Sequence, residues 1–152
     1  MIFLLIEMKL PTEKEINPHG DPDGVIAAQH WHGKNWDDGV AMLEDNPLFY
    51  QEDFCHMGYM AFSYYLCSVE LFIKSKSSIG DEDFVHGLIC TLDKRCNEII
   101  DNDKSSETKN RLLNLINYIL NNYKKFYKVD SFLRDIDFVL CNKIKHLVEA
   151  SE

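Results

Sequence analysis

The feature that most constrains the fold is a long uncharged stretch between Phe54 and Val69. With His56 taken as neutral, no residue in this stretch carries a formal charge. Apolar and small side chains recur there at helical spacing on two faces. Because a helix with two apolar faces must be covered on more than one side, we expect a central helix over residues 53–76.

Three further helices are predicted by apolar residues that recur every three or four positions. They cover about residues 81–100, 106–127 and 130–149, with Asp81 and one of two serines, at 105 or 106, as N-caps. We therefore predict an all-α fold, a bundle of four main helices, in a single domain over residues 1–152.

The N-terminal third of the chain is predicted to be less regular, with one or two short helices. Residues 11–24 are dense in turn formers. A Thr-x-x-Glu motif at 12–15 has capping-box spacing, but Pro18 follows it, so we expect a loop there. Short helices are expected at 25–32 and at 35–45, where the first residue of the second range is an asparagine cap.

The first ten residues are expected to be a loosely attached extension, with a short strand or an added helical turn at 2–6. A signal peptide is not predicted, because no basic residue precedes this apolar run and Glu7 follows it. Met8 is an alternative start of the natural chain. The uncharged stretch at 54–69 is slightly short for a membrane span of roughly 20 residues, so we expect no transmembrane helix.

Charge and cysteine content narrow the classes of function. The net charge is −9, from 16 basic and 25 acidic residues. This balance argues against binding to nucleic acid or anionic membranes, since phosphate contacts need lysine and arginine, and favours a basic protein partner. The five cysteines are odd in number and include no Cys-x-x-Cys pair, which indicates reduced thiols in a cytoplasmic protein rather than a disulfide framework.

The N-terminal third also concentrates acidic residues and both tryptophans. Residues 1–50 hold nine acidic residues and three lysines, a balance of −6. Aromatic anchors and acidic patches are typical of surfaces that bind basic proteins. The predicted partner-binding residues are Trp31, Trp36, Asp37, Asp38, Glu44 and Asp45. The alternative is that the tryptophans pack inward and hold this third of the chain on the bundle.

A metal site is a further candidate. His19, Asp21, His30 and His32 are close in the sequence. On a strand, the spacing of the last two histidines turns both rings to one face, whereas on a helix it separates them by about 200°. Because this segment is predicted to be helical, we predict no metal and no cofactor, and keep a metal-dependent enzyme using these four residues as the alternative.

Other catalytic motifs are incomplete, so no catalytic residue is predicted. Glu98 and Asp101 have the spacing of one half of a pyrophosphohydrolase motif, without a firm second half. His86 and Cys90 are four residues apart on a predicted helix and can touch. Acidic and apolar surroundings do not stabilise a thiolate, which argues against a cysteine nucleophile.

Around the central helix the chain resembles an uncharacterised bacterial family of small helical proteins. The matching segments are Gly-Lys-x-Trp at 33–36 and Ala-Phe-x-Tyr-Tyr-Leu at 61–66. Cys67 stands where that family has proline. The resemblance covers a third of the chain and implies no activity.

The leading prediction is a non-enzymatic, acidic, cytosolic protein that binds another protein. An inhibitor of a basic partner, of the immunity or antitoxin type, is its most concrete form. Besides the metal-dependent enzyme, a homo-oligomeric structural module remains open. In that case the tyrosine-rich central helix would form the interface of a homodimer.

Overall fold

The computed structural model describes residues 9–152, and within this range it contains α-helices, two short 3-10 helices and no strand. The all-α prediction is therefore confirmed. The strand or turn predicted at 2–6, and most of the extension predicted over 1–10, lie outside the described residues. The elements are α1 (Glu13–Ile16), α2 (Pro22–Trp31), α3 (Trp36–Asp45), α4 (Pro47–Gln51), η1 (Glu52–Cys55), α5 (Tyr59–Lys74), η2 (Lys76–Ser78), α6 (Glu82–Asn102), α7 (Glu107–Asn121), α8 (Tyr123–Phe126) and α9 (Phe132–Ala150).

The segment predicted as a loop over residues 11–24 is helical at both ends, so that prediction is wrong there. Thr12 and Glu15 form a complete capping box, which starts one turn of helix before Pro18. Further along, the Asp21 carboxylate accepts a hydrogen bond from the Gly24 backbone N–H at 2.7 Å. This cap, with a proline at the first helical position, starts α2 three residues earlier than apolar spacing suggests.

The predicted helix from Asn35 to Asp45 is confirmed as α3, because Asn35 and Asp38 form a capping box. The central helix, in contrast, begins at Tyr59 and not at residue 53. The residues before it form α4, η1 and a turn at Gly58, whose backbone N–H donates to the Ile16 carbonyl at 2.9 Å. The start of α5 is therefore set by its contact with α1.

Helix α5 is the centre of the core, and ten of its sixteen residues are buried. Helix α3 packs against one side of it at very short range. A Cβ atom on Gly39 would lie 2.5 Å from Ser68 Oγ, so only glycine allows this approach. Two hydrogen bonds fix the crossing: Trp36 Nε1 donates to the Tyr64 carbonyl at 3.0 Å, and Ser68 Oγ donates to the Trp36 carbonyl at 2.9 Å.

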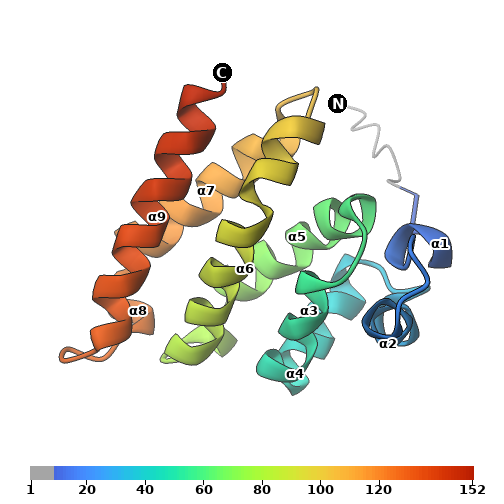
Figure 1. The fold of residues 1–152 in the computed structure, drawn as a ribbon. Coiled ribbons are helices and arrows are strands. Elements are labelled where there is room, and N and C mark those ends of the chain that lie inside the picture. Colours follow the sequence, from blue (N-terminus) through green and yellow to red (C-terminus); the bar gives the residue numbers. More distant parts are fainter. Residues whose placement is uncertain (1–8) are drawn as a thin grey trace, which may run out of the picture.

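The C-terminal half contains the long helices α6, α7 and α9. Helices α6 and α9 lie side by side, and α7 crosses behind them (Figure 1). Asp81 caps α6 as predicted. Ser106 stands at the N-cap of α7 but makes no capping bond; the Asp103 carboxylate instead accepts from the Lys109 backbone N–H at 2.7 Å. The helix predicted over 106–127 is broken at Asn122 into α7 and α8.

One hydrophobic cluster joins the two halves of the chain. It runs from Ile16 in α1 through α5 to Val148 in α9, so the N-terminal third shares its core with the C-terminal helices. In the part of the chain described, no helix combines the length and apolarity that crossing a membrane requires.

Candidate functional site

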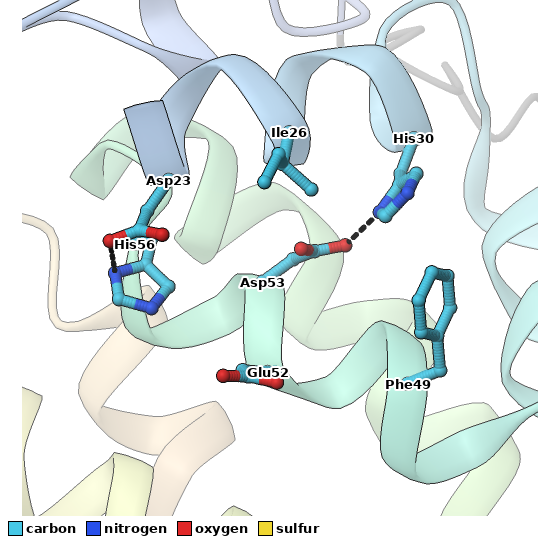
Figure 2. Close-up of a pocket in the computed structure, with 7 residues that line it drawn as sticks. All are labelled: Asp23, Ile26, His30, Phe49, Glu52, Asp53 and His56. Carbon is cyan, nitrogen blue, oxygen red and sulfur yellow. Dashed lines mark hydrogen bonds and ion pairs between the residues drawn. The ribbon is translucent and has the colours of Figure 1, made fainter. Parts of the chain in front are cut away.

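A small pocket opens between α2, the α4–η1 segment and the turn that follows it (Figure 2). Its volume is about 190 Å³. The residues that line it are Asp23, Ile26, His30, Phe49, Glu52, Asp53 and His56. Two segments that are separate in the sequence therefore build one acidic and partly aromatic depression.

Asp53 is the buried centre of this pocket, with only 5% of its surface exposed. Its Oδ2 atom accepts a hydrogen bond from Trp31 Nε1 at 2.9 Å and lies 2.7 Å from His30 Nδ1. Burial raises the pKa of the Asp53 carboxyl, and the hydrogen bonds from His30 and Trp31 oppose part of that rise. These bonds hold the last turn of α2 against η1.

His30 is held in place by aromatic rings as well as by Asp53. The ring centroids of Phe49 and Tyr50 lie 5.0 and 5.3 Å from the centroid of the imidazole. With Nδ1 paired to a carboxylate, Nε2 is the nitrogen that remains for a further partner. Such a pair can orient a hydrogen bond or transfer a proton.

The rim of the pocket carries more charge. His56 Nδ1 lies 3.8 Å from Asp23 Oδ2, and both side chains are exposed (Figure 2). Glu52 is also exposed. The pocket thus combines three carboxylates with two imidazoles, and among the described residues no lysine or arginine lines it.

The pocket lies in the most acidic part of the chain. Residues 21–56 hold eight acidic residues and one lysine, a balance of −7 within the total of −9. The four acids predicted to contact a partner are exposed on α3. Next to them on α4, Leu48 and Phe49 are exposed over 50% and 52% of their surface.

The two tryptophans follow the inward-packing alternative. Trp31 is completely buried, between the rings of Phe54 and Tyr65. Trp36 is half-buried, and its indole N–H is bonded to the backbone of α5. Trp31 therefore lies away from the surface, and its indole N–H positions the Asp53 carboxylate.

Among the described residues, the four residues of the alternative metal site do not form one cluster. Asp21 caps α2, His30 pairs with Asp53, and His19 and His32 are exposed. Within residues 9–152, no group of three or more histidine, cysteine, aspartate or glutamate side chains is arranged to hold a metal ion.

Two of the three tyrosines of the central helix pack inside a single chain, and Tyr59 is half-buried. Tyr64 and Tyr65 are buried within a single chain, and the Tyr65 hydroxyl donates to the carbonyls of Trp31 and Lys34 at 2.6 and 2.8 Å. These two rings attach the N-terminal third to α5.

Several pocket residues were not predicted. These residues, Phe49, Glu52, Asp53 and His56, lie between the helices predicted at 35–45 and 53–76 or at the predicted start of the second one. The one available signal was the acidic pair at 52–53 directly before a long uncharged stretch, where a carboxylate is costly unless it has partners.

Comparison with models of protein families, with curated proteins and with solved structures finds no match to this chain. The resemblance to a bacterial family therefore stays a prediction, and the proposals below depend on geometry and charge.

Proposed function

We propose that this protein binds a basic protein partner through the acidic face formed by α2, α3, α4 and η1. The pocket between α2 and η1 takes up one cationic side chain of that partner. The observation that carries this proposal is a pocket with three carboxylates and an exposed aromatic ring, and no lysine or arginine among its described lining residues.

The chemistry of the pocket suits a long cationic side chain. Asp23 and Glu52 at the rim are acceptors for an ammonium or guanidinium group. The exposed ring of Phe49 offers a cation–π contact, and Ile26 offers apolar surface for the methylene stem. At about 190 Å³, the pocket is smaller than typical sites for drug-sized ligands, which span roughly 300–1,000 Å³.

The acids of α3 would act at longer range. Asp37, Asp38, Glu44 and Asp45 are all exposed. Exposed charges of one sign raise the association rate with an oppositely charged partner, more than they strengthen the final complex. Leu48 and Phe49 would supply the apolar contact that charge alone lacks. An inhibitor of a basic toxin is the most concrete protein of this type.

A direct test is a titration with a short arginine-containing peptide, followed by NMR. The matched control peptide has citrulline in place of arginine, which keeps the shape and removes the charge. We expect saturable shifts of the Phe49, Glu52 and His56 amide signals with arginine only. The double variant Asp23→Asn/Glu52→Gln should abolish them, whereas Asp135→Asn/Glu149→Gln, with the same charge change on exposed acids of α9, should not.

Two results would refute the proposal. One is equal shifts with the arginine and citrulline peptides, which would show that charge does not drive uptake. The other is unchanged binding in the pocket double variant, which would place the site elsewhere on the acidic surface.

A further inference from the structure

A second cluster of titratable side chains lies between α6 and α9, apart from the acidic pocket. Asp137 on α9 is completely buried. One of its oxygens accepts a hydrogen bond from the Tyr127 hydroxyl at 2.7 Å, and the other lies 2.6 Å from His86 Nδ1. His86 Nε2 in turn lies 3.7 Å from Cys90 Sγ, four residues further along α6. Four side chains thus form one hydrogen-bonded line.

The buried carboxylate sets the tautomer of the imidazole. An ionised carboxylate only accepts hydrogen bonds, so its contact places the proton of His86 on Nδ1 and leaves Nε2 as an acceptor. The Tyr127 hydroxyl gives the carboxylate a second donor. Burial, followed by the hydrogen bond to Asp137, raises the pKa of Tyr127, so this residue stays a phenol and keeps donating.

This row of four hydrogen-bonded side chains reaches the protein surface at His86 and Cys90. Cys90 is half-buried, and 31% of the His86 side chain is exposed. Burial raises the pKa of the Cys90 thiol, and the charge of Asp137 adds to this effect. The resting thiol is therefore neutral and needs a base in contact with it in order to react. A nucleophile, a base and a group that orients the base are the three parts that a reactive thiol requires.

We propose that Cys90 is a site of covalent chemistry, a thiol that adds to the activated carbon–carbon double bond of α,β-unsaturated carbonyl compounds. Cys90 Sγ forms a bond to the β-carbon while His86 Nε2 takes the thiol proton. The π-electron pair moves toward the α-carbon and the carbonyl oxygen, and His86 then returns the proton to the α-carbon. The S–H bond is thereby added across the double bond, without a leaving group, an oxidant or a reductant.

This class of electrophile matches what the cluster provides. His86 can act first as a base and then as an acid, and the addition needs both steps from one group. A half-buried sulfur favours a small and uncharged reagent, because a charged one would lose solvation on approach. Asp137 and Tyr127 are positioning residues, since they act through His86.

The test is the reaction of the full chain with N-ethylmaleimide at pH 7, with the rate at each cysteine read by peptide mass spectrometry. Cys55 is exposed and serves as the internal reference. We expect Cys90 to form an adduct and His86→Gln to slow it about tenfold or more, with the rate at Cys55 unchanged. A Cys90 that does not react, or that reacts equally fast in His86→Gln, would overturn the proposal.

The roles of Asp137 and Tyr127 are tested by a measurement that a simple loss of stability would not change. Nitrogen-15 NMR of the His86 ring should show the proton on Nδ1 in the native protein, and loss of this preference in Asp137→Asn. Tyr127→Phe should keep the Nδ1 tautomer and slow the reaction at Cys90 less than Asp137→Asn does. A native ring protonated on Nε2 would refute the assignment, and this measurement needs no variant to fold. None of these residues lines the acidic pocket, so the two proposals can fail independently.

Discussion

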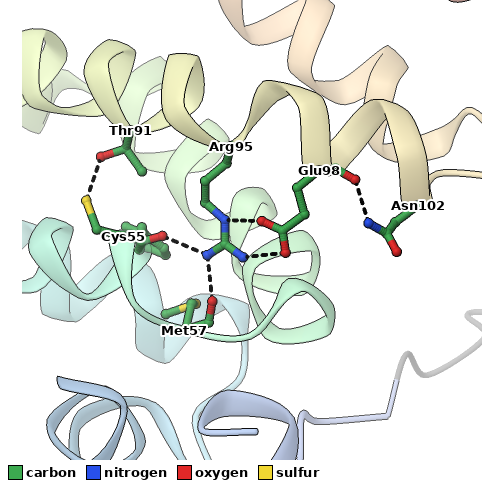
Figure 3. Close-up of polar contacts among 7 residues, drawn as sticks. Cys55, Met57, Thr91, Arg95, Glu98 and Asn102 are labelled. Atoms are coloured by element: carbon green, nitrogen blue, oxygen red, sulfur yellow. Dashed lines mark hydrogen bonds and ion pairs between the residues drawn. The ribbon is translucent and has the colours of Figure 1, made fainter. Parts of the chain in front are cut away.

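The guanidinium of Arg95 lies over the ring of Phe62, with 4.4 Å between the guanidinium carbon and the ring centroid. The same Arg95 donates through Nη1 to the carbonyl of Phe54 at 2.9 Å. Nη1 also donates to the carbonyl of Met57 at 2.6 Å (Figure 3). Its other nitrogens bond to both carboxylate oxygens of Glu98 at 3.1 Å. One buried cation therefore connects α6 with η1 and α5, and it holds the segment that carries Asp53.

Replacement of Arg95 by methionine should lower the free energy of unfolding. The methionine fills part of the space but leaves two carbonyl groups without a donor, at a cost of about 1–3 kcal/mol each. The measurement is urea unfolding followed by circular dichroism. Arg134→Met is the control, because that arginine bonds only to exposed groups, the Asp135 carboxylate and the Val129 carbonyl, and its loss should cost less than about 1 kcal/mol. Equal costs for the two variants would contradict this account of Arg95.

Replacement of Phe62 by alanine should lower the free energy of unfolding by about 3–5 kcal/mol, because it leaves a cavity in the core. Phe62 is 1% exposed, whereas Met60, two residues earlier on the same helix, is 61% exposed. Met60→Ala should therefore change stability by no more than about 0.5 kcal/mol. A near-neutral Phe62→Ala in chemical denaturation would show that this face of α5 is not packed as described.

Replacement of Gly58 by alanine should detach α1 from the start of α5. Its φ of −59° is open to any residue, so the cost is steric. The added Cβ would lie 2.2 Å from the Glu15 carbonyl oxygen, and a backbone atom cannot move aside as a side chain can. We expect a loss of about 1–3 kcal/mol, and faster amide hydrogen exchange in α1 than in α6. Unchanged exchange in α1 would mean that this contact is not tight.

Stability should fall as the pH rises above 9. Burial raises the pKa of the Cys96 thiol and of the Tyr65 phenol, and raises that of the Cys141 thiol from 9.0 to about 12. With rising pH the unfolded chain loses these protons first, so the stabilisation is complete below the ordinary pKa and is lost as pH approaches the folded value. Between its unfolded and its folded pKa, each such group lowers the free energy of unfolding by about 1.4 kcal/mol per pH unit.

Urea unfolding between pH 8 and 11 checks this expectation. Cys141→Ala removes one of the groups and should make the decline shallower between pH 9 and 11, although the variant is less stable at pH 8. A free energy of unfolding that stays constant up to pH 11 would contradict it.

Local signals in the sequence predicted much of the fold. Asn35 and Asp81 cap the helices that follow them, because a capping bond reaches only three residues along the chain. The loop expected over residues 11–24 was wrong at its two ends for a related reason. A single turn fits between the Thr12 cap and the proline, and the pattern of apolar residues does not report so short a helix.

The candidate sites depend on contacts between distant segments, which no local pattern encodes. His30 and Asp53 are 23 residues apart, and the end of α2 meets η1 where Trp31 packs against Phe54 in the core. The spacing of His86 and Cys90 showed that they can touch, as they do. Asp137, the residue that gives this pair a defined tautomer, lies 51 residues from His86 on another helix.

The placement of the two tryptophans has a consequence for spectroscopy. Trp31 is buried at the end of α2, Trp36 lies half-buried at the start of α3, and the chain has no third tryptophan. Tryptophan emission therefore comes from the N-terminal third alone, whereas far-ultraviolet ellipticity averages over every helix. An unfolding transition that comes at a lower urea concentration by emission than by ellipticity would reveal a partly unfolded state. In that state α6, α7 and α9 persist after the acidic face has unfolded.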